Sequence, residues 1–235
     1  MRPDESIVWP VSSFFTSIRI IMGKRLMIWG EKLNVQEIIQ KLENRKPGIL
    51  GSERFSKYSV LLPLIQRNDE LHVLFEIRSS KLRRQPGEVC FPGGRMDPSD
   101  ENEQHTAVRE TTEELGISEK SIAYISPLDY MISPFGTIIY PFAGFIERPE
   151  DIRPNPSEVD SIFTVPLSFL KDYKPEIFQV EYKVMPEKNF PLNQIPGGEN
   201  YNWQTRKMDE CFYFYEDKVI WGLTARILKH FIEII

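Results

Sequence analysis

The sequence predicts an α/β (α+β) protein in which a mixed central sheet is flanked by helices. Strand-like runs alternate with helical patterns along the chain, an order that packs helices onto a sheet. The chain has 235 residues, 41% of them hydrophobic, which is enough to form the core of one large domain or two small ones. Its two cysteines are too few for a disulfide framework or a Cys-rich zinc site, so we expect a reducing compartment.

Each element follows from a local pattern. The first helix begins after Asn34, a good N-cap, and ends before Pro47-Gly48. Two apolar strand-like runs follow, joined by the turn residues Asn68-Asp69. Later, residues 175–217 alternate extended runs with Pro, Gly and Asn turns. We expect helices over 34–45, 101–115 and 222–234, a short helix after 167, and strands over 57–66, 71–78, 88–91, 121–132, 136–147 and 159–167.

The helix over 101–115 has well-defined ends. Asp100 is a good N-cap, and Glu103 three residues later makes a capping-box-like pair with it. Gly116 suits the position after the helix, because glycine readily adopts the left-handed conformation there. Four residues at helical spacing form the face that we expect to pack on the protein: Val108, Thr111, Thr112 and Leu115.

Three glutamates lie close together on the other face of this helix. At ~100° per residue, Glu110, Glu113 and Glu114 occupy an arc of roughly 100°. Like charges at these spacings destabilise a helix, and the helix dipole disfavours anions at its C-terminal end. The arrangement therefore predicts a bound cation, and carboxylate oxygens suit Mg²⁺ or Mn²⁺. From the glutamates alone, the alternative is a solvated acidic face. Arg109, four residues before Glu113, is placed to brace it by a salt bridge.

The segment around these glutamates resembles the Nudix box, whose pattern is Gly-x5-Glu-x7-Arg-Glu-U-x-Glu-Glu-x-Gly-U with U aliphatic. Residues 109–117, RETTEELGI, match its second half, and the pair Gly93-Gly94 precedes them on a strand-to-loop turn. Two positions depart from the pattern. Counting back from Arg109 places Arg95 on the first Gly, so the glycine pair implies an insertion of one residue, and Thr111 occupies a U position.

A second resemblance covers residues 74–94, LFEIRSSKLRRQPGEVCFPGG. This run is similar to the extended motif of the coenzyme A pyrophosphatase branch of the Nudix family, approximately L-L-T-x-R-S-x-x-L-R-x-x-x-G-E-V-x-F-P-G-G. Phe75 and Glu76 depart from its second Leu and its Thr. The one-residue-longer spacing to the box is also a feature of that branch, and the likeness continues to about residue 230. The matching residues are Arg78, Ser79, Leu82, Arg83, Gly87, Glu88, Val89, Phe91, Pro92, Gly93 and Gly94.

The resemblance implies a Nudix-like α/β/α sandwich and metal-assisted attack of water on a diphosphate. It implies catalytic roles for Arg109, Glu110, Glu113, Glu114 and Glu158, and metal ligation by Glu110, Glu113, Glu114 and the carbonyl of Gly93 or Gly94. Arg109 would orient a glutamate rather than contact the substrate. The resemblance leaves open whether the general base is a glutamate of the box or one on a later loop. Glu158, just before a predicted strand, is the candidate outside the box for the base or a further ligand, and a surface loop residue is the alternative.

A basic cluster in this acidic protein fits the substrate of that branch. Coenzyme A carries a diphosphate and a third phosphate on its ribose, and arginine binds phosphate oxygens in pairs. The implied substrate-binding residues are Arg78, Ser79, Lys81, Arg83, Arg84 and Arg95, with a solvated loop as the alternative.

We therefore expect hydrolysis of coenzyme A or its thioesters, dependent on Mg²⁺ or Mn²⁺. The products would be 4′-phosphopantetheine, or its acyl form, and adenosine 3′,5′-bisphosphate. One alternative is a Nudix hydrolase of another nucleoside diphosphate derivative, such as ADP-ribose or a dinucleotide. The other is a catalytically silent module that binds a nucleotide.

The net charge and the terminal segments limit the expected partners, domain organisation and location. The formal net charge of −5 disfavours a general binder of nucleic acid or anionic membranes. Residues 7–22 are apolar but include Pro10 and Arg19 and are shorter than the ~20 residues that span a bilayer. We expect an N-terminal extension over 1–33 and a single hydrolase domain over 34–235. A small-molecule substrate is the expected partner, and a homodimer is compatible with the sequence. Without a C-terminal Ser-Lys-Leu signal, we expect a cytoplasmic protein.

Overall fold

The computed structural model describes residues 34–235, so the predicted extension over 1–33 lies outside the described residues. Its contacts divide the chain into one unit that ends at Leu50 and a second that begins at Gly51. In the first unit, helix α2 (Val35–Glu43) begins as predicted, because the Asn34 side chain accepts a hydrogen bond from the backbone N–H of Gln36 at 3.0 Å. The domain boundary expected at residue 34 stays a prediction.

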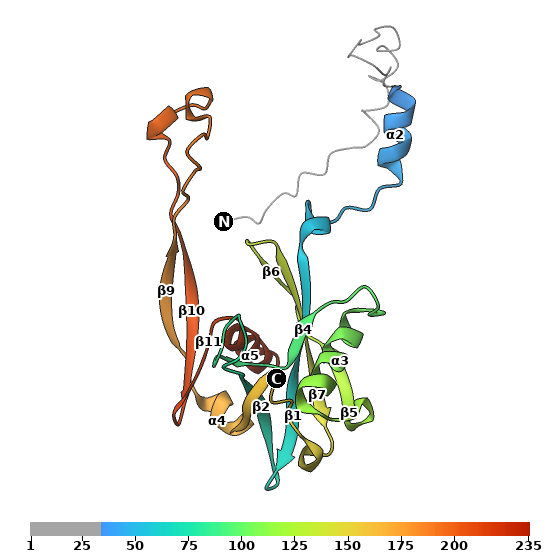
Figure 1. Ribbon diagram of the computed structural model, residues 1–235. Helices are drawn as coiled ribbons and strands as arrows, with labels where there is room; N and C mark the ends of the chain where they lie inside the picture. The colour runs from blue at the N-terminus through green and yellow to red at the C-terminus, as the bar shows by residue number, and fades with distance from the viewer. Residues whose placement is uncertain (1–33) are drawn as a thin grey trace, which may run out of the picture. The chain divides into compact units, whose positions relative to one another are not determined.

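The second unit is built on a mixed sheet of eight strands (Figure 1). These are β1 (Ser56–Arg67), β2 (Glu70–Arg78), β3 (Val89–Cys90), β4 (Gly93–Arg95), β5 (Ile122–Pro127), β6 (Met131–Ser133), β7 (Thr137–Ile146) and β8 (Val159–Pro166). The main order is β3-β2-β1-β7-β5, while β4 also pairs with β1, β6 with β7 and β8 with β2. Only β1 and β7 run parallel among these pairs.

The apolar side chains along these strands point alternately to the two faces of the sheet, and helices cover both faces. Leu61 belongs to the cluster that α3 (Glu103–Leu115) covers, with Leu74 and Leu115. Its neighbour Leu62 belongs to the opposite cluster, which α5 (Gly222–Ile234) covers with Leu228. Figure 1 shows the two helices on either side of the sheet. The predicted fold class, a mixed sheet flanked by helices, is confirmed.

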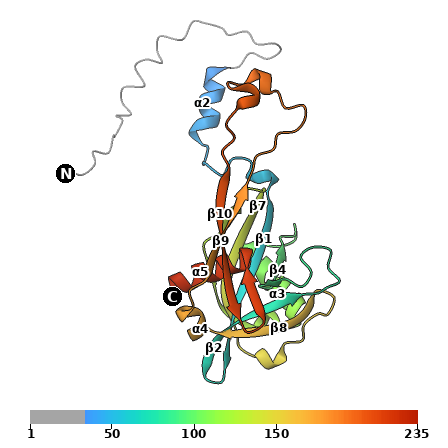
Figure 2. The same ribbon diagram turned by 90° about the vertical axis from the view of Figure 1, so that its left-hand side faces the viewer.

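A smaller sheet completes the core on the α5 side. It consists of β9 (Glu176–Tyr182), β10 (Arg206–Tyr215) and β11 (Lys218–Trp221) in the order β11-β10-β9. Figure 2 shows this sheet beside α5, and Tyr213 and Ile220 bury their side chains in the same cluster as Leu228. The helix after β8 is α4 (Leu167–Asp172). Short 3₁₀ helices occur at Ser52–Arg54, Glu119–Ser121, Pro149–Asp151, Leu192–Gln194 and Gly198–Asn200.

The turn between β1 and β2 and the end of α3 lie where the sequence predicts them. Asn68 and Asp69 join β1 to β2 with φ angles of 51° and 61°, which these short polar residues tolerate. Gly116 ends α3 in the left-handed conformation. None of the helices within residues 34–235 is long and apolar enough to cross a membrane.

Candidate active site

Helix α3 begins two residues beyond the N-cap that the sequence predicted. Its cap is Asn102, whose side chain accepts a hydrogen bond from the backbone N–H of His105 at 2.9 Å. Asp100 instead accepts hydrogen bonds from the guanidinium of Arg109 at 2.8 and 2.9 Å and from the hydroxyl of Thr106 at 2.9 Å. The prediction of Asp100 as the cap is wrong, because a buried ion pair uses its carboxylate.

The pair of Asp100 and Arg109 fixes the start of the acidic segment. The Asp100 side chain is fully buried, and the guanidinium beside it holds the pKa of that carboxyl well below its usual range. The same guanidinium lies 2.9 Å from Glu110 and 3.4 Å from Glu113. Arg109 therefore orients Glu110 more closely than Glu113, the glutamate that the spacing pointed to.

Gly93 and Gly94 of β4 bring the sheet against two glutamates of α3. The backbone N–H of Gly93 donates a hydrogen bond to Glu114 Oε2 at 2.7 Å. Gly93 has a φ of 151°, and a Cβ there would lie 2.3 Å from the backbone oxygen of Ser59. A Cβ on Gly94 would lie 2.3 Å from the carboxylate carbon of Glu110. Glycine at both positions is therefore what allows this approach.

The acidic face of α3 is divided among three environments. Glu114 is only 4% exposed, and burial together with the negative charge of Glu76 raises its pKa to about 9. Glu110, with a side chain 16% exposed, lies against Gly94, and burial raises its pKa. The Glu113 side chain is 54% exposed. Of these three glutamates, only Glu113 fits the alternative of a solvated acidic face.

Glu158 lies in a loop that is fastened both to α3 and to the run 74–94. The backbone N–H of Asn155 donates to the carbonyl of Glu114 at 2.8 Å, and the backbone N–H of Ser79 donates to the carbonyl of Glu158 at 2.7 Å. Besides burial, the negative charge of Glu158 contributes to the raised pKa values of Glu110 and Glu114. The structure thus brings this distant residue to the glutamates of the helix.

The predicted substrate-binding residues divide into exposed cations and buried supports. Ser79 is 3% exposed, and its hydroxyl lies 3.5 Å from the carbonyl oxygen of Pro156 and 3.4 Å from the backbone nitrogen of Lys81. It fastens the loop between β2 and β3 rather than opening to solvent. Arg78 is partly buried at the end of β2. The exposed cations are Lys81, Arg83, Arg84 and Arg95.

Glu76 is a further carboxylate of this region, and neither resemblance points to it as a site residue. It lies on β2 and is 1% exposed, and burial raises its pKa to about 7 against the opposing effects of the Cys90 hydrogen bond and the Arg78 charge. The signal that marks it is a glutamate between the apolar residues Phe75 and Ile77, at the position where the branch motif carries Thr.

The oxygen atoms of these residues fit a divalent cation such as Mg²⁺ or Mn²⁺, which prefer hard oxygen ligands. The negative charges of Glu76, Glu110 and Glu158 all act on Glu114. One oxygen, Glu76 Oε2, is buried with no hydrogen-bond partner among the described residues. Over residues 34–235, no three Asp, Glu, His or Cys groups already stand at ligand spacing, so a cation would have to draw the carboxylates together.

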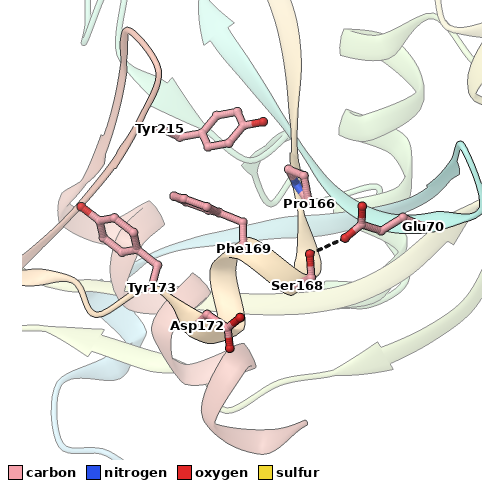
Figure 3. A pocket seen from close by; sticks show the side chains of 7 residues that line it. All are labelled: Glu70, Pro166, Ser168, Phe169, Asp172, Tyr173 and Tyr215. Atoms are coloured by element: carbon pink, nitrogen blue, oxygen red, sulfur yellow. Dashed lines mark hydrogen bonds between the residues drawn. The ribbon is translucent and has the colours of Figure 1, made fainter.

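Two surface pockets of the described residues are lined by other side chains. Figure 3 shows one of about 520 Å³ beside α4, where Phe169 lies between Tyr173 and Tyr215. The second, of about 450 Å³, lies between residues 86–89 and β11. No predicted site residue lines either of them, so neither pocket is where the carboxylates of α3 gather.

Comparison with known proteins identifies the family. The model of the NUDIX domain matches residues 56–187. Nudix hydrolase 3 of Caenorhabditis elegans is 32% identical over 184 residues, which cover 77% of this chain and 73% of that protein. A peroxisomal coenzyme A diphosphatase of Mus musculus is 40% identical over 114 residues, 48% of each chain. A mitochondrial coenzyme A diphosphatase of Homo sapiens is 37% identical over 115 residues, 48% of this chain and 49% of that protein.

The chain spans about half the length of these two coenzyme A diphosphatases. Their names place them in organelles, which contradicts the expectation of a cytoplasmic protein. That expectation is wrong because it rested on one missing address signal, and the absence of one receptor-read address does not indicate another location.

Proposed function

Because the chain belongs to the Nudix family, we propose that it is a pyrophosphohydrolase that cleaves the diphosphate of coenzyme A or its thioesters. The products would be 4′-phosphopantetheine, or its acyl form, and adenosine 3′,5′-bisphosphate. The observation that carries the proposal is the run 74–94, which joins a loop of exposed cations to the glycine pair that meets Glu110 and Glu114. Identities of 37% and 40% to coenzyme A diphosphatases, over about half of this chain, support that substrate.

The loop between β2 and β3 supplies the anion-binding part of the site. Lys81, Arg83 and Arg84 are exposed there, and no salt bridge within the described part of the chain involves them. Their charges are therefore available to the ribose phosphate and the diphosphate, which arginine forks bind with two parallel hydrogen bonds. Arg95, exposed at the end of β4, extends this positive surface to the glycine pair.

The glutamates of α3 supply the metal-binding part. When bound, a divalent cation polarises the diphosphate and lowers the pKa of a bound water. Glu110 and Glu114 would hold it, with Glu113 as the third carboxylate and the carbonyl of Gly94 as a further oxygen. Arg109 keeps the Glu110 carboxylate in place through its contact at 2.9 Å, since Asp100 fixes the guanidinium from the other side.

Glu158 is the candidate general base. Its loop is fastened to the end of α3 and to Ser79, so its carboxylate can accept a proton from water near the glutamates. The water oxygen forms a bond to one phosphorus of the diphosphate, and the bond from that phosphorus to the bridging oxygen breaks. The leaving phosphate takes the electron pair, and the proton goes to Glu158.

A product assay tests this function. The purified chain is incubated with coenzyme A, ADP-ribose or NADH, each with Mg²⁺ or Mn²⁺, and the products are identified by mass spectrometry. We expect adenosine 3′,5′-bisphosphate from coenzyme A, and its loss in Glu114→Gln. Glu119→Gln, a change of an exposed glutamate just beyond α3, is the matched control that should keep activity.

The other outcomes discriminate the alternatives. Faster cleavage of ADP-ribose or NADH than of coenzyme A would retain the hydrolase and reject the coenzyme A assignment. Binding of a nucleotide without turnover of any of the three would favour a silent binding module. Unchanged turnover in Glu114→Gln would contradict the assignment of the metal-binding residues.

A further inference from the structure

Glu76 lies in an unusual position for a carboxylate. It is 1% exposed on β2, two residues from Leu74, so both side chains are on the face of the sheet that α3 covers. The Cys90 thiol donates a hydrogen bond to its Oε1 at 3.1 Å, and its Oε2 has no partner among the described residues. Burial of an ionised carboxylate with an unpaired oxygen is strongly unfavourable unless another group compensates for it.

The surroundings of Glu76 point to a cation as that group. Cys90, which donates to Glu76, lies three residues before Gly93, and the backbone N–H of Gly93 donates to Glu114. Glu76 and Glu114 are close enough for their negative charges to act on each other. A second orphan lies on the same face: the Ser59 hydroxyl, opposite Gly94 across the β1–β4 pair, is fully buried and has no partner within the described residues. Two buried oxygen atoms on the face of the sheet that α3 covers, Glu76 Oε2 and Ser59 Oγ, thus have no hydrogen-bond partner among the described residues.

We propose that Glu76 is a ligand of the metal centre and binds, together with Glu114, a divalent cation of the Mg²⁺ or Mn²⁺ type. This inference rests on the proposed function only in that the function requires a divalent metal at the glutamates of α3. Glu76 stands where the branch motif carries Thr, so the resemblance itself implies no role for this carboxylate. The alternative is a protonated Glu76 that stays neutral and binds no metal.

Direct measurement of Mn²⁺ binding separates these two states. The full chain is freed of metal with a chelator, and the free Mn²⁺ is followed by electron paramagnetic resonance during titration at pH 8. Glu76→Gln keeps the size of the side chain and an oxygen for the Cys90 thiol but cannot ionise. We expect it to raise the Kd for Mn²⁺ at least tenfold, as loss of a ligand or of its close support does. The rise in Tm that Mn²⁺ gives should shrink accordingly.

Matched variants make the result specific. Glu70→Gln changes another glutamate of the same strand, outside the carboxylate group, and should keep the Mn²⁺ Kd of the unmodified chain. Glu114→Gln should weaken binding at least as much as Glu76→Gln. If Glu76→Gln does not fold, as far-UV circular dichroism would reveal, Glu76→Thr replaces it, because the branch motif accommodates Thr at this position.

The outcomes also separate this inference from the proposed function. A folded Glu76→Gln or Glu76→Thr with an unchanged Mn²⁺ Kd would overturn the inference, even if the chain hydrolyses coenzyme A. A Mn²⁺ affinity that depends on Glu76 would support it, even if coenzyme A is not cleaved.

Discussion

Substitution of Gly94 by alanine tests how closely the sheet must approach helix α3. A Cβ at this position would lie 2.3 Å from the carboxylate carbon of Glu110 and 2.4 and 2.5 Å from its two oxygens. Ordinary contacts begin at about 3.4 Å. In Gly94→Ala the carboxylate of Glu110 must therefore move by about 1 Å. A displacement of that size at a reacting centre lowers the rate ~100-fold.

We expect kcat/KM for the substrate of the chain to fall by about two orders of magnitude, which corresponds to ~2.7 kcal/mol of transition-state stabilisation. The free energy of unfolding should change much less, by about 1 kcal/mol, because the atoms that give way belong to the end of a flexible side chain. Steady-state kinetics and urea denaturation measure the two quantities on the same preparation.

A matched control and a double variant test whether the effect comes from the contact between Gly94 and Glu110. Gly48→Ala adds a methyl group that meets no atom within 4 Å, and it should leave both quantities unchanged. In a Glu110→Ala background, Gly94→Ala should lower activity no further, because the side chain that it displaces is absent. A Gly94→Ala enzyme with kcat/KM within threefold of the unmodified chain would refute the claim that this contact positions Glu110.

The other predictions concern stability and substrate binding. Asp100→Asn removes a fully buried partner of Arg109 and should lower the free energy of unfolding by about 3 kcal/mol in urea denaturation at pH 7. Because the pKa of Asp100 is lowered in the folded state, its contribution to the free energy of unfolding is complete above the unfolded pKa near ~3.9 and is lost as pH falls below it. Between pH 5 and 2.5, the free energy of unfolding should therefore fall less steeply in Asp100→Asn than in the unmodified chain. Gly116→Ala places a Cβ 2.1 Å from the backbone oxygen of Arg153 at a φ of 62°, so its Tm should drop by several degrees. Arg83→Ala should raise KM for coenzyme A with a smaller change in kcat, because the role proposed for this exposed cation is to bind the substrate in its ground state. Equal loss in kcat and kcat/KM would contradict that role.

The sequence predicts the elements well where periodicity and turn chemistry act locally. The alternating and continuous apolar runs become β1 and β2, and the turn between them has the left-handed conformation that Asn68 and Asp69 favour. The N-cap of α3 was missed because Asp100 and Asn102 are equally good caps by type. Their roles are decided by Arg109, about two turns along the helix from Asn102, because its guanidinium binds the Asp100 carboxylate.

The sequence selects the residues of the candidate site but does not indicate their environments. At ~100° per residue, Glu114 lies about 60° from Thr111, at the edge of the packed face, so the same spacing allows it to be solvated or buried. The amide of Gly93 decides between the two, since it lies on another element and meets Glu114 only in the folded chain. The sequence does not select Glu76, because a departure from the Thr of the branch motif does not show whether the side chain faces the core, the solvent or a site.

The distribution of charges explains why the buried carboxylates remain available for a ligand. Arg109 faces three acids, Asp100, Glu110 and Glu113, so its positive charge is already shared when α3 has formed. Glu114 receives a backbone N–H instead of a cation, and no salt bridge to it occurs in the part of the chain that the structure describes. A protein cation beside Glu114 would stabilise the fold but would compete with a metal for the same oxygens. Arg109 therefore orients the start of the acidic segment and a peptide N–H orients Glu114, which leaves the Glu114 carboxylate without a charged protein partner in the site that we propose binds a divalent cation.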